Sequence, residues 1–205
     1  MKWKNIALLA SFAVFLFFAC RDNTGSGEKT ARQEPSALTP EEQEAYLKKG
    51  AEITGTTFVA LSGALREALQ QEGVAGAVKY CNLAAYPLVD SLSRVYDADI
   101  RRTSLRVRNP KDKPSEAELA VLKAYHANRE AGAPLLPGVE LTGSSAVTFY
   151  APILIQEACL QCHGKLGETL LEEDYAVIRE LYPGDEATGY QAGDLRGMWS
   201  VTFRR

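Results

Sequence analysis

The stretch "SSAVTFYAPILIQEACLQCHGK", residues 144–165, joins a strand-like run to a cysteine–histidine motif. Its first half is rich in β-branched and aromatic residues, which are typical of a β-strand. Its second half places Cys159 and Cys162 three positions apart, with His163 directly after the second cysteine. The stretch therefore predicts a strand that leads straight into a site for a metal or a cofactor.

The spacing C-x-x-C-H is the attachment signature of c-type haem. One turn of helix lets Cys159 and Cys162 reach the two vinyl groups of a porphyrin, and His163 then supplies the proximal nitrogen. We therefore expect one covalently attached haem c. A zinc site would need two further ligands, and the chain offers only the isolated Cys81 and His126. A thioredoxin-like dithiol would sit in a βαβ unit, a pattern that the sequence does not show.

Outward from this motif, the chain reads as helices first and strands later. Thr39, Pro40 and Glu42 give the start signals of a long N-terminal helix, which Gly73 ends. A second helix follows, and Pro87 should bend or restart it just after Cys81. Further predicted elements are a strand at 99–108, a helix at 115–132, a strand at 144–155, a helix at 171–183 and a strand at 195–205. This order favours an α+β fold with an antiparallel sheet.

The long N-terminal helix carries a sustained stripe of apolar or small residues, in alternating steps of four and three. The stripe consists of Leu47, Ala51, Thr54, Phe58, Leu61, Leu65 and Ala68. It either packs entirely on its own domain or pairs in part with a second chain, because it is longer than a compact domain usually covers. We therefore keep a homodimer as a prediction.

Three segments organise the chain: a signal peptide at 1–19, a flexible polar tether at 20–37, and one domain at 38–205. The first has two lysines before an apolar run that is too short for a usual transmembrane helix. Its end resembles a lipoprotein processing site with Cys20 as the lipidated residue, although Phe17 and Phe18 depart from that pattern and leave ordinary cleavage open. We expect an exported, periplasm-facing protein of the cell envelope that meets the membrane through a lipid anchor only. The net charge of -3 gives no support for nucleic-acid binding.

Four ordered segments together resemble a family of bacterial single-haem c-type domains, first catalogued as domain of unknown function 3365. They are "YCN" at 80–82, "RRTSLRVRNPKDKP" at 101–114, "FYAPILIQEACLQCHG" at 149–164 and "GYQAGDLRGMWSV" at 189–201. The resemblance implies a PAS-like fold, in which an antiparallel sheet and flanking helices surround the haem. It also implies Cys81 as the axial ligand opposite His163. Met198 departs from the family pattern, so Met198 and then His126 are the alternative ligands.

Arginines in the 101–108 segment are either a solvated strand face or partners for the two haem propionates, which need cationic donors. Arg106 and Arg108 are the predicted propionate partners. Tyr150, in the strand that enters the motif, is predicted to pack on the haem.

Redox sensing or electron transfer is the function that these features favour, together with a separate redox or signalling protein as partner. The alternative is a haem enzyme or a gas-binding sensor with an exchangeable sixth ligand. A haem catalyst needs an open iron face and distal acid–base groups, and the sequence offers only His126 as an obvious candidate, so we expect no enzymatic activity.

Overall fold

The computed structural model describes residues 37–143 and 146–204. The predicted signal peptide, Cys20 and all of the tether except Ala37 lie outside these residues. The helices are α1 (Pro40–Leu83), α2 (Ala85–Tyr96), α3 (Glu116–Glu130), α4 (Leu160–His163) and α5 (Glu172–Leu181), with short 3-10 helices η1 (Pro110–Asp112) and η2 (Glu157–Cys159). The strands are β1 (Ala98–Thr103), β2 (Gly138–Thr142), β3 (Ala146–Leu154) and β4 (Leu195–Arg204).

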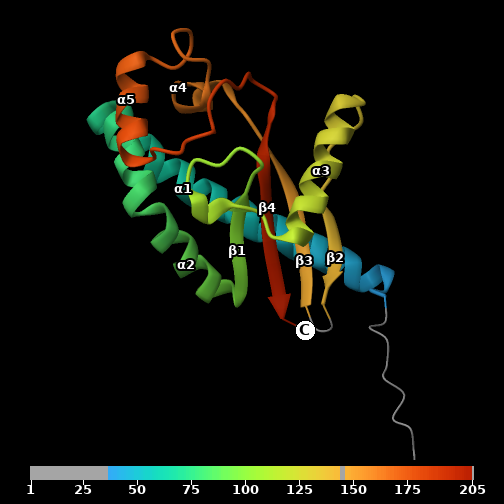
Figure 1. Ribbon diagram of the computed structural model, residues 1–205. Coiled ribbons are helices and arrows are strands. Elements are labelled where there is room, and N and C mark those ends of the chain that lie inside the picture. Colours follow the sequence, from blue (N-terminus) through green and yellow to red (C-terminus); the bar gives the residue numbers. More distant parts are fainter. Residues whose placement is uncertain (1–36, 144–145, 205) are drawn as a thin grey trace, which may run out of the picture. The chain divides into compact units, whose positions relative to one another are not determined.

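The four strands form one sheet in the order β1-β4-β3-β2, and every neighbouring pair is antiparallel. Helix α1 crosses one face of this sheet and α3 lies over the other, while α4 and α5 gather at one end (Figure 1). The predicted α+β class, the antiparallel sheet with flanking helices and the long N-terminal helix are thus confirmed.

The main core lies between α1, α2 and the sheet. Alternation along β3 and β4 sends Phe149, Val201 and Phe203 to this face, where they meet Ile53 of α1. The contact is close: a Cβ added to Gly50 would lie 2.2 Å from Cγ of Phe149. Glycine at this position therefore lets the helix backbone approach the aromatic ring of β3.

A second core lies under α3, on the opposite face of the sheet. Leu122 and Tyr125 of the helix pack on Tyr150, Leu195 and Met198 of the strands. The buried Tyr125 hydroxyl donates to the carbonyl of Leu136 at 3.0 Å. This hydrogen bond satisfies the polar end of a side chain whose ring has apolar surroundings.

Local chemistry sets the boundaries of the helices. A capping box between Thr39 and Glu42 starts α1, and Ser115 with Glu118 forms a second one at α3. Gly73 breaks α1 internally with φ of 67°, a left-handed conformation that glycine adopts readily. The chain then ends α1 at Leu83 and restarts at Ala85, so that Pro87 lies in the first turn of α2, as the sequence predicts.

The strands differ from the prediction at two places. Strand β1 ends at Thr103 rather than continuing to 108, because Ser104 donates its hydroxyl to the carbonyl of Arg196 at 2.6 Å and the chain turns away from β4. The short strand β2 is present although the sequence analysis did not predict it.

The predicted stripe of α1 is only partly buried. Thr54 and Leu61 face the core, but Ala51 and Phe58 are exposed, and Ile53 and Thr57 take part in the packing instead. Dimerisation stays a prediction. Within the described ranges, no helix combines the length and the apolarity that crossing a membrane requires.

Candidate functional site

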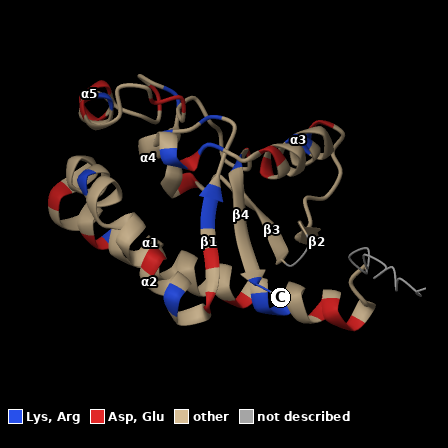
Figure 2. Ribbon diagram, turned by 60° about the horizontal axis from the view of Figure 1, so that its bottom comes forward, with Lys and Arg blue, Asp and Glu red and all other residues tan. Residues whose placement is uncertain are grey.

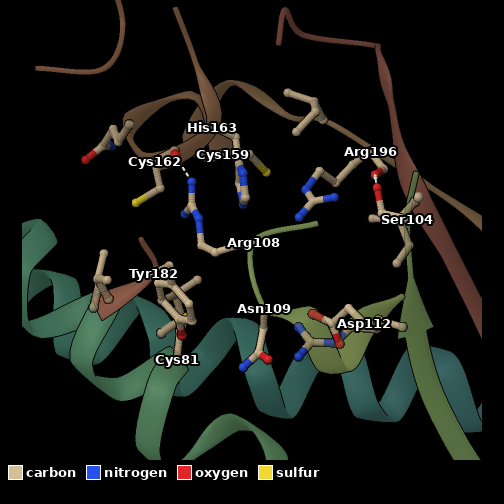
Figure 3. A pocket seen from close by; sticks show the side chains of 18 of the residues that line it. Cys81, Ser104, Arg108, Asn109, Asp112, Cys159, Cys162, His163, Tyr182 and Arg196 are labelled. Atoms are coloured by element: carbon tan, nitrogen blue, oxygen red, sulfur yellow. Dashed lines mark hydrogen bonds between the residues drawn. The ribbon is translucent and has the colours of Figure 1, made fainter. Parts of the chain in front are cut away.

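A cavity of about 270 Å³ lies at the end of the domain where α4 meets the sheet. Its walls come from distant parts of the chain: α1, the end of β1 and the segment after it, the end of β3, the motif, and the start of β4. Cys159, Cys162 and His163 border it from one side and Cys81 of α1 from the other (Figure 3). The structure thus brings together all four predicted sulfur and imidazole groups around one space.

His163 is held by a backbone carbonyl that the sequence analysis did not predict. Its Nδ1 lies 2.6 Å from the carbonyl oxygen of Ala187, which can only accept a hydrogen bond. Nδ1 therefore carries the proton, and Nε2 keeps its lone pair. An imidazole fixed in this way is ready to bind a metal through Nε2.

Burial lowers the pKa of His163 well below its ordinary value, and the positive charge of Arg108 acts in the same direction. The hydrogen bond to Ala187 opposes this shift but does not reverse it. The ring is consequently neutral at ordinary pH, which is the protonation state that a metal ligand needs.

Residues 185–190 clasp the motif through main-chain hydrogen bonds. The amide of Tyr190 donates to the carbonyl of His163 at 3.0 Å, and that of Gly189 donates to Gly164 at 2.7 Å. The Tyr190 ring also meets the His163 ring edge-on, with 6.3 Å between their centroids. The position of the histidine is therefore set by this segment, which we call the 185–190 clasp.

Arg108 ties the clasp to the motif from inside the cavity. Its Nε and an Nη donate to the two carboxylate oxygens of Asp185 at 3.1 and 3.2 Å. The same Nη donates to the carbonyl of Cys162 at 2.6 Å (Figure 3). The Asp185 side chain is fully buried and that of Arg108 is 11% exposed. Asp185 also accepts from the amide of Ala187 at 3.0 Å, so one buried ion pair supports the group that holds His163.

Cys81 reaches the cavity from the last turns of α1, beyond the break at Gly73. Burial raises its pKa, while Arg102 and Arg108 lower it by favouring the thiolate. Across the cavity, burial raises the pKa of Cys162 to about 11, so this thiol is protonated in the cofactor-free chain.

Four of the predicted or alternative site residues do not line this cavity. Arg106 donates to the carbonyls of Glu186 and Thr188 and stacks on Tyr190 at 4.4 Å, so it stabilises the clasp from outside. Alternation along the strands turns Tyr150 and Met198 toward α3, on the other face of the sheet. His126 lies on α3 and is also absent from the cavity wall.

Arg102 and Arg196 line the cavity although the sequence analysis did not select them. The alternation that it recognised already puts Arg102 on the same face as Arg108, whereas nothing near Arg196 distinguishes it. Basic residues colour the end of β1 that points toward α4 (Figure 2).

The remaining walls are mostly apolar and come mainly from α1, the end of β3 and the residue that follows it. They include Leu65, Leu69, Val78, Ile153, Leu154 and Ile155. An apolar cavity with a fixed neutral imidazole, two thiols beside it, a third thiol across it and several arginines matches the donor set of a covalently bound, anionic haem. Among the described residues, no three His, Cys, Asp or Glu side chains form a metal-binding group.

The fold and the cavity define an α+β domain that presents a cysteine–histidine motif to a buried, arginine-lined space. The chain belongs to the Tll0287-like family, whose model matches residues 30–204. The match does not identify this family with domain of unknown function 3365.

The structure is similar to a solved structure described as the cyanobacterial heme-protein Tll0287. The TM-score is 0.55 and the sequence identity is 22%, over 82% of this chain and 98% of the other. A likeness at this identity supports the shared fold. No curated protein matches the chain.

Proposed function

We propose that the chain binds one haem of c type, with thioether bonds to Cys159 and Cys162 and with His163 and Cys81 as axial ligands. The observation that carries this proposal is the His163 ring, which donates through Nδ1 to Ala187 and turns a neutral imidazole toward the cavity. The similarity to a structure described as a heme-protein supports it as well.

Haem of this kind supplies reversible one-electron exchange, so we propose electron transfer or redox sensing as the function, through a separate partner protein. The residues of the chain support this, because His163 lines the cavity from the clasped motif and Cys81 lines it from α1. Together they would hold a bound iron and leave it no position for a substrate. On this ground we propose that the protein is not an enzyme.

Axial ligation by Cys81 has a chemical consequence. A thiolate donates electron density to iron and stabilises the ferric state, which lowers the reduction potential, whereas methionine raises it. Burial raises the pKa of Cys81 while Arg102 and Arg108 oppose this shift, so a bound iron would have to displace the thiol proton. With Cys81 as a ligand the proposed centre would have a low potential, and a weaker hold of Cys81 on the reduced iron would give it a means of signalling through α1.

The decisive experiment is to produce the full chain together with haem-attachment machinery and to measure its intact mass. The expected mass exceeds that of the polypeptide by one haem, and acid–acetone fails to extract the group. Cys159→Ala with Cys162→Ala is the matched control, in which haem becomes extractable. Zinc without iron in a metal assay overturns the proposal.

Carbon monoxide distinguishes the alternative of an exchangeable sixth ligand. Slow or absent binding to the reduced protein is expected when Cys81 holds the iron. Fast binding in the unmodified protein favours a gas-binding sensor or a haem enzyme instead.

We further propose that the protein is exported and held at the cell envelope through a lipid on Cys20. The sequence of residues 1–20 supports this. Incorporation of labelled fatty acid that disappears in Cys20→Ala tests it, and a wild-type chain without label removes the anchor.

A further inference from the structure

We propose that Arg102 and Arg196 form the anion site of the cavity and bind the two propionate carboxylates of the haem. This inference rests on the proposed function, because the anion it names belongs to that cofactor. It replaces Arg106 and Arg108 as propionate partners with two arginines that enter the cavity from the sheet.

The cavity wall contains three arginines, and one of them already has its anion. Arg108 makes a two-point ion pair with Asp185 and donates a further hydrogen bond to the carbonyl of Cys162. Such a paired guanidinium, held in a fork by a buried carboxylate, has little capacity left for a second carboxylate. Arg108 therefore holds the motif in place and is not available to the propionates.

Arg102 and Arg196 have no such partner in the described ranges, where neither belongs to any of the ion pairs. Arg196 donates one hydrogen bond, from Nη1 to the carbonyl of Arg106 at 3.0 Å. The Arg102 guanidinium lies over the Trp199 ring, 5.8 Å from its centroid. Most of the donors on both guanidinium groups thus remain free.

Charge in the cavity favours an incoming anion. Burial lowers the pKa of Arg196, and the charge of Arg108 acts in the same direction, whereas Tyr190, Asp112 and Asp185 oppose the shift. The acidic residue in the cavity wall, Asp112, accepts a hydrogen bond from the Tyr86 hydroxyl at 2.7 Å. A half-buried cation without an ion-pair partner has lost part of its hydration, and a carboxylate-bearing ligand would compensate for that loss.

The two arginines line the same cavity, so a ligand with two carboxylates could contact both of them. Arg102 is on β1 and Arg196 on the neighbouring strand β4, and both border the cavity from the sheet. Figure 3 shows the Arg196 guanidinium directed into the space below the motif. The cysteines enter from η2 and α4 instead. A porphyrin tethered to them through its vinyl groups would have its propionates on the side away from the cysteines, where the strands lie.

Arg101 provides a matched control of the same residue type. It is next to Arg102 in β1, but it points to the other face of the sheet, where it contacts Glu118 at 3.6 Å. Removing its charge alters the net charge of the domain as much as removing Arg102 or Arg196 does.

The test compares Arg102→Gln and Arg196→Gln with Arg101→Gln in the haem-loaded protein. We expect lower reduction potentials in the first two, because a lost cation near the haem favours the ferric state. Redox-difference infrared spectra with isotope-labelled propionates should show shifted carboxylate bands in these two variants and not in the control.

Arg102→Lys and Arg196→Lys complete the test and remain informative where a glutamine variant fails to fold. They keep the charge and lose the two-point geometry, so the potential should stay near that of the wild type while the carboxylate bands move. Unchanged bands in the Arg102 and Arg196 variants overturn this inference and leave the proposed function standing. A wild-type chain that acquires no haem removes both.

Discussion

The ring of His163 and the side chain of Asp185 meet on the same peptide group. Nδ1 of His163 lies 2.6 Å from the carbonyl of Ala187, and Oδ1 of Asp185 accepts from the amide of that residue at 3.0 Å. Asp185 is in turn the ion-pair partner of Arg108. The orientation of the histidine thus depends on a buried carboxylate to which it is not directly bonded.

Asp185→Asn should lower the free energy of unfolding by about 3–5 kcal/mol, because it leaves Arg108 buried without its anion. Urea denaturation measures this. In a double-mutant cycle, adding Arg108→Met should cost much less in the Asp185→Asn background than alone. Asp194→Asn is the control, since Asp194 accepts from a backbone amide in an exposed turn. Equal losses at positions 185 and 194 would contradict the prediction.

Cys81→Ser should abolish the low-spin thiolate signature in the electron paramagnetic resonance spectrum of the ferric protein and raise its reduction potential. Cys81→Ala should act in the same direction, because both variants remove the thiol that lines the cavity opposite the motif. If spectrum and potential both stay unchanged, the ligand lies elsewhere, and Met198→Leu followed by His126→Ala are the next variants to record.

Gly50→Ala should lower the free energy of unfolding by about 1–3 kcal/mol, since the new Cβ would overlap the Phe149 ring. Gly55→Ala, on the same helix, has nothing within 4 Å of the added Cβ and should stabilise the domain by about 0.5–1 kcal/mol. Thermal unfolding of the two variants against wild type measures both signs. A stabilising Gly50→Ala would show that α1 does not lie this close to β3.

Tyr125 predicts a loss of stability in alkali. Burial raises the pKa of Tyr125 to about 12, with the charge of Glu140 adding to the effect. The folded state binds the phenolic proton more tightly than the unfolded state, so this contribution is complete below the ordinary tyrosine pKa of about 10 and is lost as pH rises toward 12. Between pH 10 and 12, the free energy of unfolding should fall less steeply with pH in Tyr125→Phe than in the wild type. An identical slope in both proteins would argue against a buried Tyr125.

Phe58→Glu tests the predicted homodimer. Phe58 and Val59 lie side by side on α1 and are 44% and 69% exposed, so they offer apolar surface to a second copy. Light scattering of residues 38–205 should report a dimer that Phe58→Glu dissociates. A monomer mass at high micromolar concentration removes the prediction.

Much of the fold could be predicted because its signals are local. Capping boxes at Thr39 and Ser115, the glycine at position 73 and the composition of β3 and β4 each act within a few residues of sequence. Strand β1 was extended too far because its alternation continues past Thr103, while the contact that turns the chain, from Ser104 to Arg196, spans most of the domain. Strand β2 is only five residues long and gives a weak pattern.

In the site, too, the features with a local sequence signal could be predicted, and those that depend on contacts between distant residues could not. The motif and Cys81 were found from residue type and spacing, together with a family resemblance. The carbonyl of Ala187 carries no side-chain signal, so no sequence pattern could assign it to His163. Arg106 and Arg108 alternate correctly with Arg102, but their partners, the clasp and Asp185, lie some 80 residues away and decide which guanidinium stays free.

The central position of β4 bears on the proposed attachment of haem. Strand β4 lies between β1 and β3 in the sheet and pairs with both. It is also the last of the four strands along the chain. The 185–190 clasp directly precedes it. Until β4 docks, the sheet is incomplete and the motif at 159–163 remains open to an attaching enzyme. In a chain that acquires covalent haem, the interval before β4 docks is thus the time window for that reaction, and mutations that hasten docking would lower the yield of holoprotein while stabilising the fold.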